Sequence, residues 1–409
     1  MRVSYYSPLP PERSGIADYS ALLLPALRRR IEIAVAGRRT PFLRRGDVAL
    51  YHIGNDPEAH GWIVEALRRR PGVVVLHDFV LHHLIAGLTL GRGNAAGYVE
   101  AMERDAGAPG RALAEAVVAG RAPPPWETRA HEFPLAGEIL ELATAVIVHS
   151  RYVERLVRGY GYGGRIWRIP LAFWPLPGVV PADVGGAPVF GAFGHVNASK
   201  RVPQLLRAFS RVRARRPLAR LVLAGAVAPH FELGSHVAEL GLADAVVQEG
   251  YVDEPRLWAL MAGCDVVVSL RWPTMGETSA VALQALTLGK PLVVSDVGWF
   301  SELPDEVALR IPVGDDEVEA LAVALETLSD DEELARRMGE AGRDYVRAEH
   351  DLERVAEGYA AALEWAAGGE EVADAVLREL AQAAADVGIE PESAELRQLA
   401  ERVREIELV

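Results

Sequence analysis

The sequence predicts an α/β protein made of two doubly wound, Rossmann-like domains that face each other across a cleft. Its 409 residues exceed what a single hydrophobic core usually serves. Short apolar runs alternate with amphipathic stretches, which is typical of strands and helices that wind a parallel sheet. A stretch rich in Pro, Gly and Val at 170–188 has no period of its own and divides the pattern into two.

The first domain is expected at 1–170. A strand at 2–6 leads through a Pro/Gly loop into a helix that begins near Gly15, and a further helix is expected at 58–69. Residues 95–140 have helical periodicity broken by three prolines, which predicts an inserted helical subdomain. The remaining strands of this domain are expected at 31–36, 48–53, 73–77, 145–149 and 166–169.

The second domain is expected at 188–350, after a linker at 171–187. Residues beyond 351 are helical and acidic. The tail at 366–409 has apolar residues at helical spacing, which suits a hairpin that packs on the body or on a second copy of the chain in a homodimer. The strands of this domain are expected at 189–193, 221–224, 246–249, 266–270, 292–295 and 308–311.

Charge is unevenly distributed along the chain. The formal net charge of -14 argues against a nucleic-acid partner, which would need clustered cations. Residues 1–170 nevertheless carry 22 basic against 17 acidic residues, and the remainder 21 against 40. Arginine clusters at 28–30, 38–39, 44–45 and 68–70 supply much of the first excess. They could contact an anionic acceptor or a membrane surface. The favoured interpretation is that they cap helix C-termini and stay solvated.

The sequence also predicts a cytoplasmic protein. Cys264 is the only cysteine, so an internal disulfide is excluded. The first residues lack the layout of a signal peptide, and no apolar run reaches the roughly 20 residues that span a bilayer.

Lysine is scarce, which draws attention to Lys200. Only Lys200 and Lys290 occur among 43 basic residues. Lys200 lies in the loop at 194–201, after the first strand of the second sheet, where a compact ammonium could neutralise a departing diphosphate. Lys290 is expected to cap the preceding helix.

The loop at 271–277 is the second candidate site. It links a buried strand to a helix that begins near Thr278 and Ser279 and ends before Gly289. Free backbone N–H groups at a helix start bind anions, although an ordinary N-cap explains Thr278 or Ser279 equally well. Glu277 would repel a phosphate, so we expect it to accept bonds from sugar hydroxyls; a solvated loop acid is the rival reading.

Two features of the first domain should face the same cleft. Gly15 opens the first helix and lets backbone approach a ligand without a Cβ in the way. His77 and Asp78 close a strand at its carboxyl end. A satisfied core histidine is the alternative for His77.

Five segments together resemble the family 4 retaining glycosyltransferases, which have the GT-B fold of two facing Rossmann-like domains. The resemblance covers about residues 1–365. It includes a last helix, 351–365, that crosses back onto the first domain. The segments are PERSGIADYS at 11–20, LHDF at 76–79, VIVHSRYVERL at 146–156, FGHVNASKR at 193–201 and PTMGETSAVALQALTLGKPLVVSDVG at 273–298.

The resemblance implies a metal-independent transfer of sugar from a nucleotide-diphosphate sugar, with retention of configuration and no cofactor. Gly15 and Gly194 would lie near the diphosphate, and His77 near the transferred sugar. The implied roles of the others are neutralisation of the diphosphate by Lys200, sugar binding by Glu277 and phosphate contact by Thr278 and Ser279.

Two departures from the family pattern concern the donor. His195 stands where the family usually has an arginine, for which Arg201 is the candidate substitute. Gln284 stands where the second glutamate of the acidic motif belongs, so its contact with ribose would lack a charge.

The acceptor is not identified by the sequence; Asn55, His60 and His82 are candidate contacts. An epimerase of the same fold and a non-catalytic nucleotide-sugar binder remain as alternatives. A NAD-dependent oxidoreductase is disfavoured, because no Gly-x-Gly-x-x-Gly joins the first strand to its helix.

Overall fold

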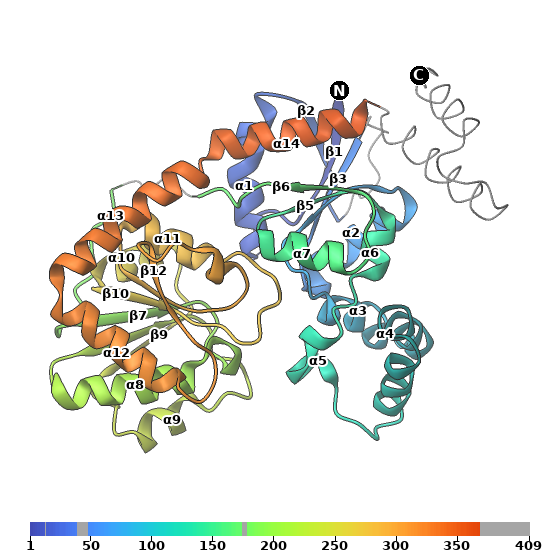
Figure 1. Ribbon diagram of the computed structural model, residues 1–409. Coiled ribbons are helices and arrows are strands. Elements are labelled where there is room, and N and C mark those ends of the chain that lie inside the picture. The colour runs from blue at the N-terminus through green and yellow to red at the C-terminus, as the bar shows by residue number, and fades with distance from the viewer. Residues whose placement is uncertain (13, 39–47, 174–177, 369–409) are drawn as a thin grey trace, which may run out of the picture.

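The computed structural model describes residues 1–12, 14–38, 48–173 and 178–368, which form two parallel six-stranded sheets with helices on both faces (Figure 1). We call the first sheet with its helices the first unit, and the second sheet with its helices the second unit. The predicted α/β architecture is therefore confirmed.

The first sheet has the order β2-β1-β3-β4-β5-β6. Its central strands are continuous apolar runs; all six residues of β3 are buried, for example. Such runs suit a parallel sheet that is covered on both faces. The strands are β1 (Arg2–Tyr6), β2 (Glu32–Val35), β3 (Val48–Ile53), β4 (Gly72–Leu76), β5 (Ala143–Val148) and β6 (Arg165–Arg168).

Helices of the first unit lie against this sheet or form the insert. The predicted helical insert exists and lies at the edge of the unit that faces away from α14 (Leu352–Ala367) (Figure 1). Gly107 breaks its main helix, α4, with a positive φ of 61°. The helices are α1 (Gly15–Arg28), α2 (Pro57–Arg69), α3 (His82–Leu88), α4 (Ala95–Val118), α5 (Pro125–Thr128), α6 (Gly137–Leu142) and α7 (Arg151–Gly159).

The second sheet has the order β12-β11-β10-β7-β8-β9. Its strands are β7 (Val189–Phe193), β8 (Arg220–Ala224), β9 (Val246–Gly250), β10 (Val266–Ser269), β11 (Leu292–Ser295) and β12 (Ala308–Ile311). Its helices are α8 (Val202–Arg215), α9 (Leu233–Glu239), α10 (Glu254–Gly263), α11 (Ala280–Leu288), α12 (Glu317–Asp330) and α13 (Glu332–Glu349).

The last described helix, α14, crosses from the second unit back onto the first, as the resemblance implied (Figure 1). Asp351 caps it by accepting a bond from the N–H of Arg354. Its Glu353 carboxylate bonds the guanidinium groups of Arg29 and Arg30 in α1. Two arginines of the first cluster therefore pair with a carboxylate that lies 324 and 323 residues further along the chain.

The order of strands reverses at one point in each sheet, and the loops at these points diverge and leave a crevice. In the first sheet the reversal lies between β1 and β3, so the crevice is bounded by the loops that begin at Ser7 and at Gly54. In the second it lies between β7 and β10, which places the loops 194–201 and 270–279 side by side.

Backbone hydrogen bonds join the two units at this edge. The carbonyl oxygen of Met275 accepts bonds from the N–H groups of Phe79 (2.8 Å) and Val80 (2.9 Å). The Glu302 carboxylate caps α7 of the other unit by accepting from the N–H groups of Arg151 and Tyr152. The carboxyl ends of the two sheets are thus held face to face.

Small differences from the sequence prediction matter at two strand ends. Strands expected at 73–77 and 145–149 end at Leu76 and Val148. His77 and His149 therefore lie just past their strands, where side chains enter the crevice. The acidic tail, from 369 onward, and Arg39, Arg44 and Arg45 lie outside the described residues.

None of the helices in the described ranges is both long and apolar enough to cross a bilayer. The cytoplasmic location stays a prediction, as do the exact domain limits.

Candidate functional site

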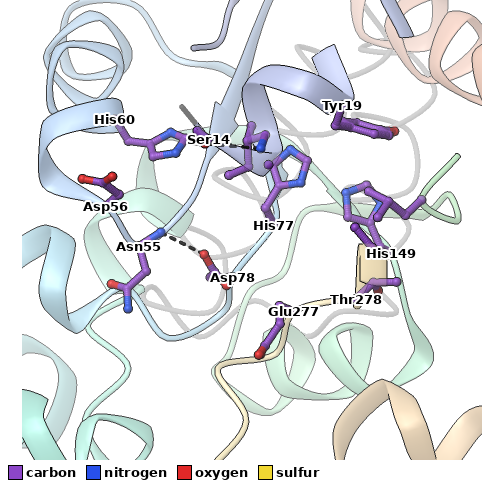
Figure 2. Close-up of a pocket in the computed structure, with 14 residues that line it drawn as sticks. Ser14, Tyr19, Asn55, Asp56, His60, His77, Asp78, His149, Glu277 and Thr278 are labelled. Carbon is purple, nitrogen blue, oxygen red and sulfur yellow. Dashed lines mark hydrogen bonds between the residues drawn. The ribbon is translucent and has the colours of Figure 1, made fainter. Parts of the chain in front are cut away.

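A cavity of about 380 Å³ lies between the carboxyl ends of the two sheets. The first unit contributes residues that follow β1, β3, β4, β5 and β6, and the second unit contributes the start of α11. Figure 2 shows how these side chains surround the space. The lining residues are Ser14, Gly15, Ile16, Tyr19, Asn55, Asp56, His60, His77, Asp78, His149, Leu171, Glu277, Thr278 and Ala280.

The start of α1 forms one side of the cavity. The Ser14 hydroxyl caps the helix by accepting from the N–H of Ile16 at 3.2 Å. At Gly15 a Cβ would meet no atom within 4 Å, so this backbone borders open space. The backbone at Gly15 therefore leaves room for a ligand to approach closely, and the predicted role of Gly15 in binding stays a prediction.

Three imidazoles line the cavity, and all are kept uncharged by burial. Burial lowers the pKa of His60 and of His149 to about 4, and lowers that of His77 well below its usual value. The nearby His149 and His52 lower the pKa of His77 further. At neutral pH this wall therefore presents neutral rings to a ligand.

Asp78 and Asn55 meet beside His77. The N–H of Asn55 donates to Asp78 Oδ2 at 2.9 Å, and burial raises the pKa of the Asp78 carboxyl. The Asn55 side chain accepts from the N–H of Leu84 (3.1 Å), so it also holds the start of α3. Asn55 lines the cavity with part of its bonding capacity already used.

The opposite side of the cavity is formed by the loop that carries Glu277. Its carboxylate accepts bonds from the Thr274 hydroxyl (3.1 Å) and the Met275 N–H (2.8 Å), and it pairs with the Arg271 guanidinium. This anchoring fixes the carboxylate at the cavity edge. The rival reading of Glu277 as a solvated loop acid does not hold, because its side chain is 15% exposed.

Thr278 and Ser279 differ in how they are used at the start of α11. The Ser279 hydroxyl accepts from the N–H of Ala282 at 3.3 Å, which is the ordinary N-cap role. Thr278 lines the cavity, and its buried Oγ1 has no hydrogen-bond partner among the described residues. A buried hydroxyl of this kind is available to a ligand.

Lys200 lies in a smaller hollow next to the cavity, with Gly194 and His195 among its lining residues. Burial lowers the pKa of the Lys200 ammonium well below its usual value, and the nearby Arg271 lowers it further. The N–H of Trp272 donates to the carbonyl of Ser199 at 2.8 Å. The lysine loop is therefore tied to the loop that carries Glu277.

Arg271 is the second basic residue of this region, and its side chain is partly buried. Burial lowers the pKa of its guanidinium to about 10, while Asp78 of the first unit acts in the opposite direction. The main-chain N–H of Arg271 donates to the Ser295 hydroxyl. Lys200 and Arg271 are two partly buried basic groups whose charged forms an anion would stabilise.

Arg201, the candidate substitute for the missing arginine, is engaged elsewhere. Its guanidinium forms a bidentate pair with the Glu317 carboxylate at the start of α12, where the glutamate is 1% exposed. Its φ of 56° lies in the left-handed region that favours glycine. As a second cation near Lys200, Arg271 is better placed than Arg201.

His82 and Gln284 do not line either space. Both ring nitrogens of His82 are bonded, to the carbonyl of Phe133 (2.8 Å) and the hydroxyl of Tyr98 (3.0 Å), so the ring anchors the helical insert. Gln284 is buried within α11. An acceptor role for His82 and a ribose role for Gln284 receive no support from their positions.

The predicted site residues thus fall into three sets. The cavity collects Gly15, Asn55, His60, His77, Glu277 and Thr278, and the hollow collects Gly194, His195 and Lys200. Arg201, Ser279, Gln284 and His82 lie in neither. Sequence reasoning missed Arg271 and His149, although each is a polar residue that follows a buried apolar strand, which is the signal that had singled out His77.

Among the described residues, no group of three or more His, Cys, Asp or Glu is placed to hold a metal ion. The surface arginines of the first unit are largely paired: Arg38 with Glu12, and Arg68 with Glu138 and Glu65.

The family model of glycosyl transferases group 1 matches residues 182–345, which span the second sheet and both of its site loops. Among curated proteins, the α-D-kanosaminyltransferase of Streptomyces kanamyceticus is 27% identical over 40% of this chain and 42% of its own length. The D-inositol 3-phosphate glycosyltransferase of Paenarthrobacter aurescens is 31% identical over 36% of each chain. The matches to these relatives therefore span about two fifths of their lengths.

Solved structures extend the likeness to both units. Sucrose-phosphate synthase from Thermosynechococcus elongatus aligns with a TM-score of 0.58 and 18% identity, over 89% of this chain and 98% of its own. HepE from Anabaena, in complex with UDP and glucose, aligns with a TM-score of 0.59 and 17% identity, over 89% of this chain and 99% of its own. Both are similar in fold. Together, these comparisons show that the chain has the GT-B fold and that its second unit matches the group 1 glycosyltransferases.

Proposed function

We propose that this protein transfers a sugar from a nucleotide-diphosphate sugar to an acceptor hydroxyl, with retention of configuration and without a metal. The observation that carries the proposal is the cavity between two strand-order reversals, with neutral imidazoles on one side and Glu277 on the other. Arg271 pairs with Glu277, and Lys200 lies near Arg271.

The diphosphate is assigned to the second unit. Burial disfavours the charged forms of Lys200 and Arg271, which are partly buried, so an incoming diphosphate would stabilise their charges. They supply the compensation that a metal gives in other transferases. The start of α11 adds free N–H groups and the unpaired Thr278 hydroxyl. Arg271 thereby takes the place that the family's usual arginine leaves vacant at His195.

The transferred sugar is assigned to the cavity. Glu277 accepts bonds from its hydroxyls, and Gly15 lets the backbone of α1 come close to it. His77 contacts the sugar from the first unit. The acceptor hydroxyl then attacks the anomeric carbon from the face that the diphosphate leaves. The bond between the anomeric carbon and the phosphate oxygen breaks, and the proton of the acceptor hydroxyl passes to the departing phosphate.

Arg271 links the diphosphate site to the sugar site in this proposal. In the structure Arg271 pairs with Glu277 and lies near Asp78, so its charge is compensated. A diphosphate competes for this guanidinium and leaves Glu277 free to accept from sugar hydroxyls. Donor binding and organisation of the sugar site are therefore one event in this proposal.

A ligand panel followed by product analysis tests the proposal. Thermal unfolding is measured with UDP, GDP and ADP. UDP is included because the structurally similar HepE is in complex with UDP-glucose, and GDP and ADP test whether the base matters. One diphosphate is expected to raise the midpoint selectively. The sugars of that nucleotide are then incubated with neutral sugars and polyols without added metal and with a chelator, and the anomeric configuration of the product is determined by NMR.

Four results would contradict separate parts of the proposal. Failure of every diphosphate to stabilise the chain removes the donor site. An inverted product removes the same-face mechanism. Donor turnover to its epimer without any acceptor favours an epimerase, and loss of activity with chelator removes metal independence.

A further inference from the structure

His52 is a buried histidine that the proposed mechanism does not use. It lies in β3 with no exposed surface, behind the wall of the cavity, and it does not line the cavity itself. Polar side chains at such positions are uncommon unless they bond to something specific. Two of the three histidines that line the cavity, His60 and His77, bond to this one residue.

Those two bonds leave His52 from different atoms. His60 Nδ1 donates to the main-chain oxygen of His52 at 3.1 Å. The His52 side chain meets His77 directly, with 2.9 Å between His52 Nδ1 and His77 Nε2. The rings stack with their centroids 5.2 Å apart. His52 thus holds the orientation of both imidazoles.

Each of the two rings carries one proton at neutral pH. Burial lowers the pKa of His52 and of His77 well below the usual value, and His149 and His60 lower the pKa of both further. In the bond between them, one nitrogen must therefore donate and the other must accept. Two arrangements of the protons satisfy this condition.

The second nitrogen of His52 distinguishes the two arrangements. His52 Nε2 is buried and has no partner among the described residues. If His77 Nε2 donated, His52 Nε2 would carry a hydrogen that no acceptor meets. If His52 Nδ1 donates, His52 Nε2 keeps only a lone pair. Buried donors without a partner are rarer in proteins than buried acceptors without one.

We propose that His52 is a positioning residue whose Nδ1–H donates to His77 Nε2 and so holds His77 as the tautomer with a hydrogen on Nδ1. With Nε2 engaged, Nδ1–H is the group that His77 offers to a ligand in the cavity. His77 then acts as a hydrogen-bond donor to an oxygen of the sugar. It does not act as a base, which agrees with a transfer in which the departing phosphate takes the proton.

Aromatic rings around the pair restrict the orientation of both imidazoles. The ring of Tyr359 in α14 stacks on the His52 ring, with 6.2 Å between the ring centroids and an interplanar angle of 4°. The Tyr5 ring also packs on His52, with a centroid distance of 4.8 Å. The rings of Tyr19 and His77 meet edge to face, and the centroids of the His77 and His149 rings are 5.0 Å apart (Figure 2). The helix that crosses between the units therefore packs directly on the residue that orients His77.

The tautomer is tested in the full-length wild-type protein, without any substrate. The protein is labelled with ¹⁵N in histidine, and long-range proton–nitrogen correlation spectra are recorded at pH 7.5. The His77 signals are assigned by their loss in His77→Gln. We expect His77 to carry its proton on Nδ1. A proton on Nε2 of His77 overturns the proposal.

The role in catalysis rests on the proposed function and is tested with two variants of His52. The amide nitrogen of asparagine reaches close to the position of imidazole Nδ1 and donates as it does, whereas leucine fills similar space without a donor. We expect His52→Asn to keep kcat within roughly threefold. We expect His52→Leu to lower kcat by roughly 10- to 100-fold, the usual loss when a residue that orients a functional histidine is removed.

Binding of the nucleoside diphosphate is the internal control, because its site lies in the second unit. Its Kd should be the same in both variants. Full kcat in His52→Leu, or an equal loss in His52→Asn, contradicts the positioning role. If the wild type transfers no sugar at all, the proposed function fails, while the NMR spectrum still decides the tautomer.

Discussion

The two sides of the cavity hold polar groups in opposite ways. On the first unit, buried imidazoles have lowered pKa values and stay neutral. On the second, the Arg271 guanidinium pairs with the Glu277 carboxylate, and the basic side chain of Lys200 lies near Arg271. A neutral wall suits the hydroxyls of a sugar, and a charged wall suits a diphosphate. In the proposed function, the diphosphate therefore belongs to the second unit, and the sugar lies between the imidazoles and Glu277.

The net charge of each half does not predict this division. Residues 1–170 have an excess of basic side chains and the remainder a large excess of acidic ones, yet the partly buried Lys200 and Arg271 belong to the acidic half. The reason is that surface arginines such as Arg30 pair with acids such as Glu353 and Glu357. What matters for binding is charge that is buried and aimed at the ligand, since solvent screens the rest.

The largest expected effect is a loss of stability when Arg201 is removed, which would show that Arg201 belongs to a structural ion pair and not to the charged wall. Arg201→Ala removes the partner of Glu317, which is 1% exposed, and should lower the free energy of unfolding by about 3–5 kcal/mol. Chemical denaturation measures this loss. The double variant Arg201→Ala/Glu317→Ala should recover part of it, because no buried charge is left unpaired.

Donor affinity provides the alternative outcome for this pair. If Arg201→Ala keeps wild-type stability but weakens binding of the nucleoside diphosphate, Arg201 belongs to the charged wall as the sequence suggested. The assignment of Arg271 as the second cation would then be wrong.

Loss of a cation from the charged wall should have the next largest effect. Lys200→Ala is expected to lower kcat/KM by about 10²- to 10³-fold, because a preorganised charge contact with the departing diphosphate is lost. Steady-state transfer assays measure this change. The matched control is Lys290→Ala, the other lysine of the chain, whose ammonium lies near Cys264 and Asp265. Equal losses in both variants would show that the effect is not specific to the site.

Much of the fold could be predicted from the sequence, because each strand is a separate apolar run. The strands at 48–53, 292–295 and 308–311 have the predicted limits, and the insert lies where its helical period is broken by prolines. Apolar periodicity reports burial on a sheet directly. Where strands end is less certain, since main-chain bonds rather than side-chain types decide it, as at His77.

The site could be predicted only in part. Gly15, His77 and Glu277 follow buried strands or open helices, so position alone placed them at the cavity. The partners of a side chain depend on residues far away in sequence. Arg201 meets Glu317 from 116 residues further on, and nothing local indicates that this pair removes it from the donor site.

The neutral wall makes a prediction about pH. The pKa of His60 and of His149 is about 4 in the folded chain, against about 6.5 when unfolded. Between these values the unfolded chain binds protons that the folded chain does not. The stability from these two rings is complete above pH 6.5, and it should fall by about 1.4 kcal/mol per pH unit for each ring as the pH drops toward 4.

Denaturation at several pH values between 7 and 4.5 measures this slope. His149→Gln keeps a polar side chain without a titrating ring, so it should reduce the slope by the share of one histidine. The same slope in the variant and the wild type would show that His149 titrates normally and that this wall is not held neutral.

The smallest expected effect on stability concerns Gly15, where the two walls approach the ligand. Gly15→Ala should be neutral or stabilise the fold by about 0.5–1 kcal/mol, because a Cβ meets no protein atom within 4 Å and alanine is the better helix former. The same methyl group would enter the cavity. We therefore expect weaker donor binding, measured by calorimetry, together with an unchanged or higher melting temperature. Undiminished donor affinity in this variant would mean that the ligand does not approach the start of α1, and that the sugar is held by the charged wall alone.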